Sequence, residues 1–274
     1  MAAASSASYA GSPGRLNLGG LARTWELLLL LTARDVKLRY EGTVLGLLWT
    51  LAKPLLQALV FSFALSTVLR VKFGEDVPYV LFLLAALFPW TWFQSSIQSS
   101  AASFSNNAAL LKKVYFPRFV LPLSAVTSQL LHFALSIPIL VLLLVVAGYY
   151  PGPEWLLGVP LLTLIQLLML AGAVLLVASF NVFVRDLEHL VEVLMTLWLY
   201  LTPILYPLSM LRERVGPLIY LNPMASLIQA WRDLFLYDQL PGIDIWPALV
   251  FTALALVAGS ITFKTLEGHF EAVL

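Results

Sequence analysis

The chain has 274 residues, of which 60% are hydrophobic and only 11% are charged, and its mean hydropathy is +0.89. Soluble domains contain roughly 25% charged residues, so this chain cannot cover a water-exposed surface, and most of its surroundings must be lipid. The net charge of +1 provides no field that would favour a nucleic-acid partner. The absence of cysteine excludes disulfides, thiolate metal sites and cysteine nucleophiles.

The N-terminal segment, MAAASSASYAGSPGRLNLGG, is made of small and polar residues. It lacks the basic-then-apolar order of a secretory signal peptide, so we expect residues 1–20 to form a disordered cytoplasmic tail. Residues 21–40 follow with Leu21, Trp25 and Leu28 on one helical face and charges towards the end. This pattern predicts an amphipathic helix lying in the inner membrane interface, and an ordinary solvated helix is the alternative.

A charged stretch, RDVKLRYE, stands directly before the first long apolar run. Basic side chains commonly flank the cytoplasmic end of a membrane span, so this stretch indicates a helix that leaves the cytoplasm for lipid. The pair Gly42 and Gly46 follows, with the Gly-x-x-x-Gly spacing of helix contacts. Because it stands at the start of the span, a bend or a close approach to the preceding interfacial helix is an equal alternative.

Six apolar segments approach the roughly 20 residues that a membrane-spanning helix needs. Backbone groups cannot stay unpaired in lipid, so we predict an all-α integral membrane protein in which residues 21–274 form one transmembrane domain. Between the last two spans, charges and prolines interrupt apolar residues, which predicts short re-entrant helices at the outer face, or two small packed surface helices. The predicted spans are residues 45–69, 79–97, 119–147, 155–182, 193–208 and 245–263.

The distribution of Lys and Arg predicts that both termini are cytoplasmic. Eleven of these residues fall on the inner side if the N-terminus is inside, and an even number of spans returns the C-terminus to the same side. The five assigned to the outer side are Arg70, Lys72, Arg212, Arg214 and Arg232.

Motifs for chemistry are absent from the sequence. There is no Gly-Lys pair and therefore no Walker loop, and no GxSxG or HExxH motif occurs. His132 is the histidine within a predicted span, accompanied by Gln129, and we expect a structural interhelical hydrogen bond there. Acidic residues lie only near span ends, which argues against a proton- or sodium-coupled transporter. A membrane enzyme that acts on lipids would need a nucleophile or metal cluster that the sequence does not offer.

Four blocks of sequence carry a family resemblance. The first is RDVKLRYEGTVLGLLWTLAKPL, which contains the residues that we name the junction motif: Arg34, Asp35, Lys37, Arg39 and Tyr40. The others are LLKKVYFPRFVLPLS, VFVRDLEHLVEVLMTLWLYLTPILYP and LNPMASLIQAWRDLF. Together they resemble the permease subunits of type-2 ABC exporters, most closely those for polysaccharides, O-antigen, capsule or teichoic acid.

The resemblance implies a homodimer that docks two copies of a cytoplasmic ABC ATPase in the bacterial inner membrane. ATP and Mg²⁺ would belong to that partner, with no cofactor on this chain, and the substrate would be a lipid-linked glycan. A type-2 permease for small amphiphiles such as drugs or haem is the alternative. Two inner segments would contact the ATPases, with plain anchoring by positive charge as the competing interpretation for the lysines. The residues expected to couple are Asn106, Asn107, Lys112, Lys113, Arg185, Asp186 and Glu188.

A path for a sugar polymer is expected to be lined by aromatic and polar groups, because aromatic faces contact sugar rings. Two sets of residues recur at helical spacing, so we predict that the first and fifth spans line the path, with simple helix packing as the alternative. A lone lysine within a span favours protein or water as its surroundings, although snorkelling to headgroups also explains it. The sets are Trp49, Lys53, Gln57 and Phe61, and Thr196, Tyr200 and Pro203.

Overall fold

The computed structural model of the chain describes residues 18–43, 46, 48–68, 77–114, 116–184, 186–210 and 216–270. Within these ranges the chain is helical and contains no strand, in agreement with the all-α prediction. Most of the expected tail, residues 1–17, lies outside the described part, and the first helix already begins at Leu18.

Five helical segments in the described part are long and apolar enough to cross a membrane, and each coincides with a predicted span. Windows of 18 to 27 residues rise roughly 27–40 Å at 1.5 Å per residue, which suits a hydrocarbon core of about 30 Å. They are α2 (Leu48–Ser62) with the π-helix η1 (Phe63–Val68), α3 (Tyr79–Ala101), α6 (Val120–Val146), α7 (Trp155–Asn181), and α11 (Trp246–Leu266) flanked by η3 (Ile243–Ile245) and η4 (Glu267–His269).

The remaining predicted span, residues 193–208, differs from the structure. Helix α8 runs over Leu187–Leu201, only 15 residues, and Thr202 after it is extended, with φ −90° and ψ 139°. Pro203 explains this end, because a proline restricts the residue before it to extended conformations and lacks the N–H that a helix requires. Glu188 in the first turn favours the early start, since negative charge stabilises a helix N-terminus. Helix α8 alone is short for a crossing, so this fifth span, and with it the count of six, stays a prediction.

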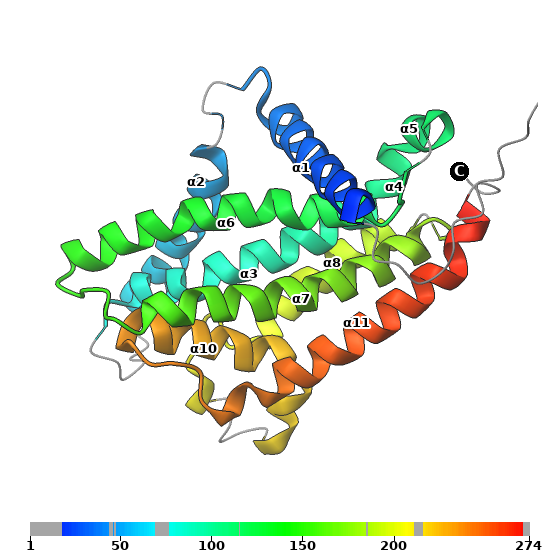
Figure 1. Cartoon of the computed structure of the whole chain (residues 1–274). Coiled ribbons are helices and arrows are strands. Elements are labelled where there is room, and N and C mark those ends of the chain that lie inside the picture. The colour runs from blue at the N-terminus through cyan, green and yellow to red at the C-terminus, as the bar shows by residue number, and fades with distance from the viewer. Residues whose placement is uncertain are drawn as a thin grey trace, which may run out of the picture.

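The segment expected to be amphipathic forms α1 (Leu18–Tyr40), which lies across α6 (Figure 1). Trp25 and Leu30 are 61% and 63% exposed on it, and its position in a membrane interface stays a prediction. The chain then turns at Gly42 and Gly46, whose φ angles are 76° and 50°. A Cβ on either glycine would meet no atom within 4 Å. The Gly-x-x-x-Gly pair is therefore a bend before α2, and the helix-contact interpretation is wrong.

The segment before the last span contains η2 (Gly216–Leu221) and α10 (Pro223–Tyr237). Asn222 caps α10, since its Oδ1 accepts a hydrogen bond from the Met224 N–H at 3.1 Å. Helix α10 packs against α3, α7 and α11, and Trp231 and Arg232 on it are fully buried. It is thus a packed helix within the bundle, and a re-entrant dip into the membrane stays a prediction.

Helix α3 forms the centre of the bundle, with α6 and α7 along it (Figure 1). Of its residues 78% are buried, compared with 17% for the α2–η1 span. Trp92 stacks on Phe133 with ring centroids 5.0 Å apart, and Phe133 meets Trp231 at 5.2 Å. Buried Gln166 accepts from Trp231 Nε1 at 2.9 Å and donates to the Pro89 carbonyl at 2.8 Å. One aromatic core therefore joins α3, α6, α7 and α10, while α2 stays largely uncovered.

Helices α7 and α11 pack closely because small residues face each other. A Cβ on Gly172 would overlap the backbone of Ala255, and one on Gly259 would overlap the backbone of Gly172. Close approach of backbones at small residues is typical of helix pairs in membranes.

Candidate translocation and coupling site

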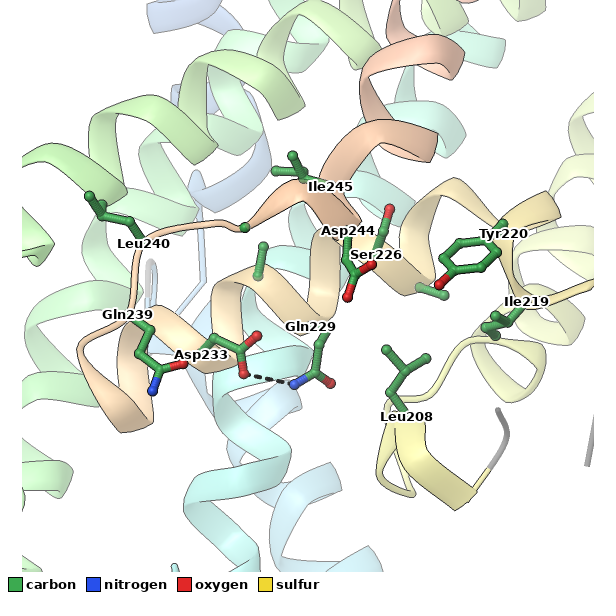
Figure 2. Close-up of a pocket in the computed structure, with 13 residues that line it drawn as sticks. Leu208, Ile219, Tyr220, Ser226, Gln229, Asp233, Gln239, Leu240, Asp244 and Ile245 are labelled. Atoms are coloured by element: carbon green, nitrogen blue, oxygen red, sulfur yellow. Dashed lines mark hydrogen bonds between the residues drawn. The ribbon is translucent and has the colours of Figure 1, made fainter. Parts of the chain in front are cut away.

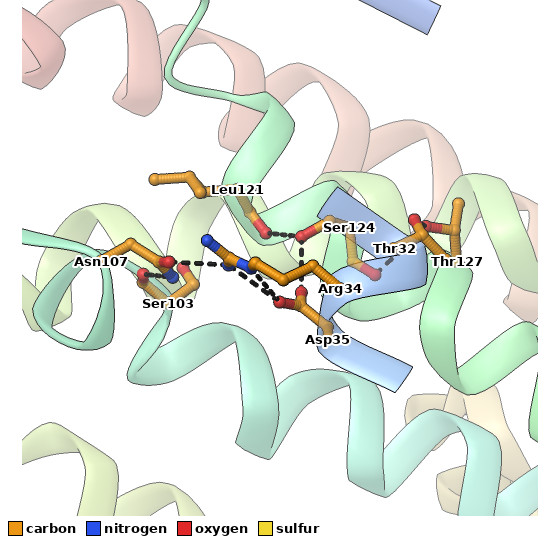
Figure 3. Close-up of polar contacts among 8 residues, drawn as sticks. All are labelled: Thr32, Arg34, Asp35, Ser103, Asn107, Leu121, Ser124 and Thr127. Atoms are coloured by element: carbon orange, nitrogen blue, oxygen red, sulfur yellow. Dashed lines mark hydrogen bonds and ion pairs between the residues drawn. The ribbon is translucent and has the colours of Figure 1, made fainter. Parts of the chain in front are cut away.

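The junction motif is tied to the start of α6 and to the connection between α4 (Ser103–Asn106) and α5 (Ala108–Lys113) (Figure 3). Arg34 Nη2 donates to Asp35 Oδ1 at 2.8 Å and to Asn107 Oδ1 at 2.7 Å. Ser124 Oγ donates to Asp35 Oδ2 at 3.0 Å, and Asn107 Nδ2 donates to the Ser103 carbonyl at 2.8 Å. The sequence predicted separate roles for Arg34, Asp35 and Asn107, and the structure brings them together.

A groove of about 690 Å³, here called the junction groove, lies beside this network. It is lined by part of the junction motif, by the α4–α5 connection and by the start of α8, together with residues of α3 and α6. The predicted residues that meet there are Arg34, Asp35, Arg39, Asn106, Asn107 and Glu188. Its many polar and charged lining residues, at one end of the bundle, suit contact with a water-soluble protein partner.

A second cavity, here called the α2 cavity, has a volume of about 410 Å³ and lies between α1, α2, α3 and α6. Trp49 and Lys53 of α2 line it together with Arg39 and Tyr40 of α1. Gln57 and Phe61, predicted for the same path, are absent from this lining and lie further along α2. The cavity therefore combines two cations with aromatic side chains. Two of the four residues predicted on this helix, Trp49 and Lys53, line it.

A chain of hydrogen bonds forms one wall of the α2 cavity. His132 joins Tyr40 through Nε2 and Oη at 2.9 Å, and joins Gln129 through Nδ1 and Oε1 at 2.9 Å. Gln129 Nε2 and Arg39 Nη2 both donate to Ser99 Oγ, at 3.2 and 3.3 Å. The expected interhelical hydrogen bond of His132 is confirmed, and the chain of hydrogen bonds as a whole holds α1 against α3 and α6.

Residues 26–236 match the ABC-2 type transporter family. The chain belongs to this family. It is 40% identical over 261 residues to the O-antigen export system permease protein RfbA of Klebsiella pneumoniae, covering 95% of this chain and 98% of that protein. It is 36% identical over 248 residues to the protein of the same name from Myxococcus xanthus, covering 89% of this chain and 94% of the relative. The chain is therefore an integral membrane permease, a transport subunit and not an enzyme.

The predicted path residues on α8 of this ABC-2 permease lie apart from the α2 cavity. Thr196 and Tyr200 are exposed, and the cavity contains no residue of α8. Pro203 does not continue their helical face, because α8 ends at Leu201, and it is buried. Helices α2 and α8 instead each pack on α3. The expected spacing through Pro203 is thus wrong, and a path shared by the first and fifth spans is not closed within one copy.

The predicted coupling residues of the ABC-2 permease gather at one end of the bundle. Lys112 and Lys113 are exposed in the last turn of α5, and Asp186 is exposed before α8. Lys37 of the junction motif is also exposed, near the end of α1. Arg185, the remaining coupling candidate, lies outside the described residues.

Sequence reasoning did not predict the roles of Asn222 and Arg232, which join the third and fourth family blocks. Asn222 accepts from Trp198 Nε1 at 2.9 Å and donates to Thr202 Oγ1 at 3.1 Å. Arg232 is 1% exposed and donates to the carbonyls of Phe82, Pro203 and Ile204. Arg232 was counted from the sequence among the outer charges; it is buried and holds the turn after α8, and its side of the membrane stays a prediction. The Asn-Pro and Thr-Pro pairs were the available signals, because they mark a cap and a helix end.

Proposed function

We propose that this chain is the membrane subunit of an ATP-driven exporter that moves a lipid-linked polysaccharide, such as an O-antigen, across the bacterial inner membrane. The observation that carries the proposal is the end-to-end likeness to O-antigen export permeases, over 95% of this chain. Because the sequence has no Gly-Lys pair, and a Walker loop needs one, ATP and Mg²⁺ would bind to separate ABC ATPase subunits.

The complex would contain two copies of this chain and two ATPases. Helices α2 and α8 support this arrangement, because both carry large apolar side chains that the single chain leaves exposed. Val60 and Phe63 on the first span are 64% and 63% exposed, and Leu197 and Leu201 on α8 are 55% and 68% exposed. Apolar faces of two copies would meet there around a two-fold axis, and the path would run between them.

Six crossings with both termini in the cytoplasm complete the proposed topology. Helix α8, extended by the buried turn at Thr202, Pro203 and Ile204, would provide the fifth crossing. The inner side would then carry α4, α5 and the junction motif, with α1 in the interface. Removing Arg232 from the outer charges leaves eleven basic residues against four, which strengthens the positive-inside argument.

The α2 cavity suits the reception of a glycan on an anionic linker. Arg39 and Lys53 bring positive charge to it, while Trp49 and Trp92 offer aromatic faces for a sugar ring. ATP-driven movement would reach this cavity from α4 and α5 through the Arg34–Asn107 hydrogen bond and α1. The mechanism is a rigid-body push on α1, which forms one wall of the cavity.

The proposal is tested in cells that lack this chain but retain their ATPase and glycan synthesis. We expect lipid-linked polymer to accumulate inside and surface polysaccharide to disappear, and the wild-type chain to restore export. Lys53→Gln should restore it poorly, whereas Lys264→Gln, an exposed lysine at the end of α11, should match the wild type. Unchanged surface polysaccharide in the deletion strain would contradict glycan export and favour a permease for small amphiphiles.

A further inference from the structure

A third pocket lies where η2, α10 and the segment leading into α11 meet (Figure 2). These elements are at the opposite side of the bundle from α4 and α5 (Figure 1). The pocket has a volume of about 220 Å³, below the roughly 300–1,000 Å³ of sites for drug-sized ligands. None of its lining residues belongs to α1 or α2. It is therefore separate from the α2 cavity and has room for one small group.

Helix α10 presents polar side chains to this pocket. Ser226, Gln229 and Asp233 line it at intervals of three and four residues, which places them on one helical face. Gln229 Nε2 donates to Asp233 Oδ1 at 2.8 Å and so orients the carboxyl group (Figure 2). Burial raises the pKa of Asp233, while the Gln229 hydrogen bond and the charge of Arg232 oppose the rise. A carboxylate that is withdrawn from water is stabilised by any additional hydrogen-bond donor.

The facing wall comes from the chain between α10 and α11, which supplies Gln239 and Asp244. Its direction is set at Asp238, whose φ of 49° is left-handed, and the Gln239 N–H donates to the Asp233 carbonyl at 3.0 Å. Gly152 leaves space for this turn, because a Cβ there would overlap the Asp238 carboxyl group. The Gln239–Asp233 hydrogen bond and the packing of Asp238 on Gly152 therefore fix the position of this wall.

The lining combines acceptors with an aromatic ring. Tyr220 packs against Trp246 with ring centroids 5.6 Å apart and borders the pocket near Ile219 (Figure 2). The residues that line the pocket include two carboxylates and two amides but no Lys or Arg. An anionic group such as a phosphate is disfavoured there, whereas hydroxyl groups find acceptors and the apolar face of a sugar finds an aromatic ring.

We propose that this pocket binds one uncharged sugar residue of the exported glycan. Asp233 and Asp244 accept hydrogen bonds from its hydroxyl groups, Gln229 and Gln239 bind further hydroxyls, and Tyr220 contacts the ring face. The inference rests on the proposed export function and deepens it. It assigns a sugar-recognising site to the side of the bundle away from the coupling elements, where the polymer leaves.

The test measures oligosaccharide binding to the purified permease–ATPase complex in nanodiscs. The probe is the repeat-unit oligosaccharide of the cell's own surface polysaccharide, released from lipid and phosphate, and the readouts are saturation-transfer NMR and calorimetry. We expect at least a tenfold loss of affinity for Ser226→Leu, which fills the pocket, and for Gln229→Ala. Glu154→Gln, a half-buried carboxylate before α7 that lies outside the pocket, should bind like the wild type.

Equal affinity in wild type, Ser226→Leu and Gln229→Ala would overturn the pocket assignment. Binding of Ca²⁺ at Asp233 and Asp244 without oligosaccharide binding would overturn it as well. Export is measured separately in cells with the same variants, so that failure of the proposed export function can be distinguished from failure of the pocket assignment. Absence of export by the wild-type chain contradicts the proposed function, whereas normal export with unchanged oligosaccharide affinity in the variants contradicts only the pocket.

Discussion

Arg232 illustrates how a charged residue can serve the interior of a membrane protein. Its guanidinium carbon lies 3.6 Å from the centre of the Phe82 ring, and its nitrogens donate to three backbone carbonyls. Two of these carbonyls belong to Pro203 and Ile204, where α8 has ended and helical partners are missing. A guanidinium, with five donors in a fixed plane, suits such a cluster of acceptors better than an ammonium.

Replacing Arg232 with methionine should therefore destabilise the protein strongly. Each buried carbonyl left without a donor costs roughly 1–3 kcal/mol, so we expect a loss of at least about 3 kcal/mol. At about 2–4 °C per kcal/mol, the thermal midpoint in detergent should fall by roughly 6–12 °C. Arg23→Met, at an exposed position of α1, is the control, and equal midpoints for both variants would refute the role of Arg232.

Asp233 gives stability a dependence on pH. Because burial raises its folded-state pKa, the folded protein holds the proton more tightly than the unfolded chain, which favours folding at low pH. This contribution is lost as pH rises through the raised pKa. Asp233→Asn should thus be more stable than the wild type at neutral pH, and the difference should shrink on acidification. The thermal midpoints of both proteins are measured from neutral to acidic pH. A difference between the two midpoints that does not change with pH would contradict the prediction.

At the scale of elements, the contacts of α1 link α4 and α5, the proposed coupling segments, to the α2 cavity. Arg34 at one point of α1 bonds to the α4–α5 connection, and Tyr40 at its end bonds to His132 in the cavity wall. Thr32 adds a 2.6 Å hydrogen bond to Thr127 of α6 (Figure 3). Motion of α5 is expected to reach the cavity through this helix without any change inside the aromatic core.

A double-mutant cycle on Arg34→Ala and Asn107→Ala measures this link. A hydrogen bond to a charged group contributes about 1.5–3 kcal/mol, so each single variant should lower glycan-stimulated ATPase activity of the complex by roughly tenfold to a hundredfold. The double variant should lose little more than either single variant, because both remove the same contact. Additive losses would show that the two residues act independently.

The sequence predicted the elements that depend on local composition, and it did not predict those that depend on contacts between distant segments. Spans such as α6 and α7 were predictable because lipid demands long apolar helices. The end of α8 was missed because the apolar character continues past Pro203, although the helix does not. The burial of Arg232 was not predictable, because its carbonyl partners lie on α3 and after α8. The pocket between η2, α10 and the segment leading into α11 likewise forms from Tyr220, α10 and Asp244, which only packing brings together.

At the scale of the whole molecule, the proposed transporter contains two copies of this chain. Helix α3 is enclosed, while α2 and α8 on its two sides expose apolar faces. The α2 cavity opens beside one of these helices, and the proposed path residues Thr196 and Tyr200 lie on the other. A second copy would cover both helices and bring the two halves of the path together.

The absence of native cysteine permits a direct test of this dimer. A single cysteine at Val60 on α2 or Leu197 on α8 should give disulfide-linked or reagent-linked dimers in membranes, because positions near a two-fold axis meet their own copies. Leu164 on α7 and Val257 on α11 are the controls, with similar exposures of 52% and 59%. Dimers through the controls but not through α2 or α8 would place the interface elsewhere.

Glycan-driven ATP hydrolysis tests the export function most directly. The measurement is the ATPase rate of this chain, co-purified with its ABC ATPase and reconstituted in lipid, with and without the lipid-linked polysaccharide. Export of a lipid-linked glycan predicts a rate that rises with the polysaccharide and is abolished when the Walker lysine of the ATPase is replaced. A rate that ignores the glycan and responds to small amphiphiles would contradict it, as would the failure of the two proteins to associate.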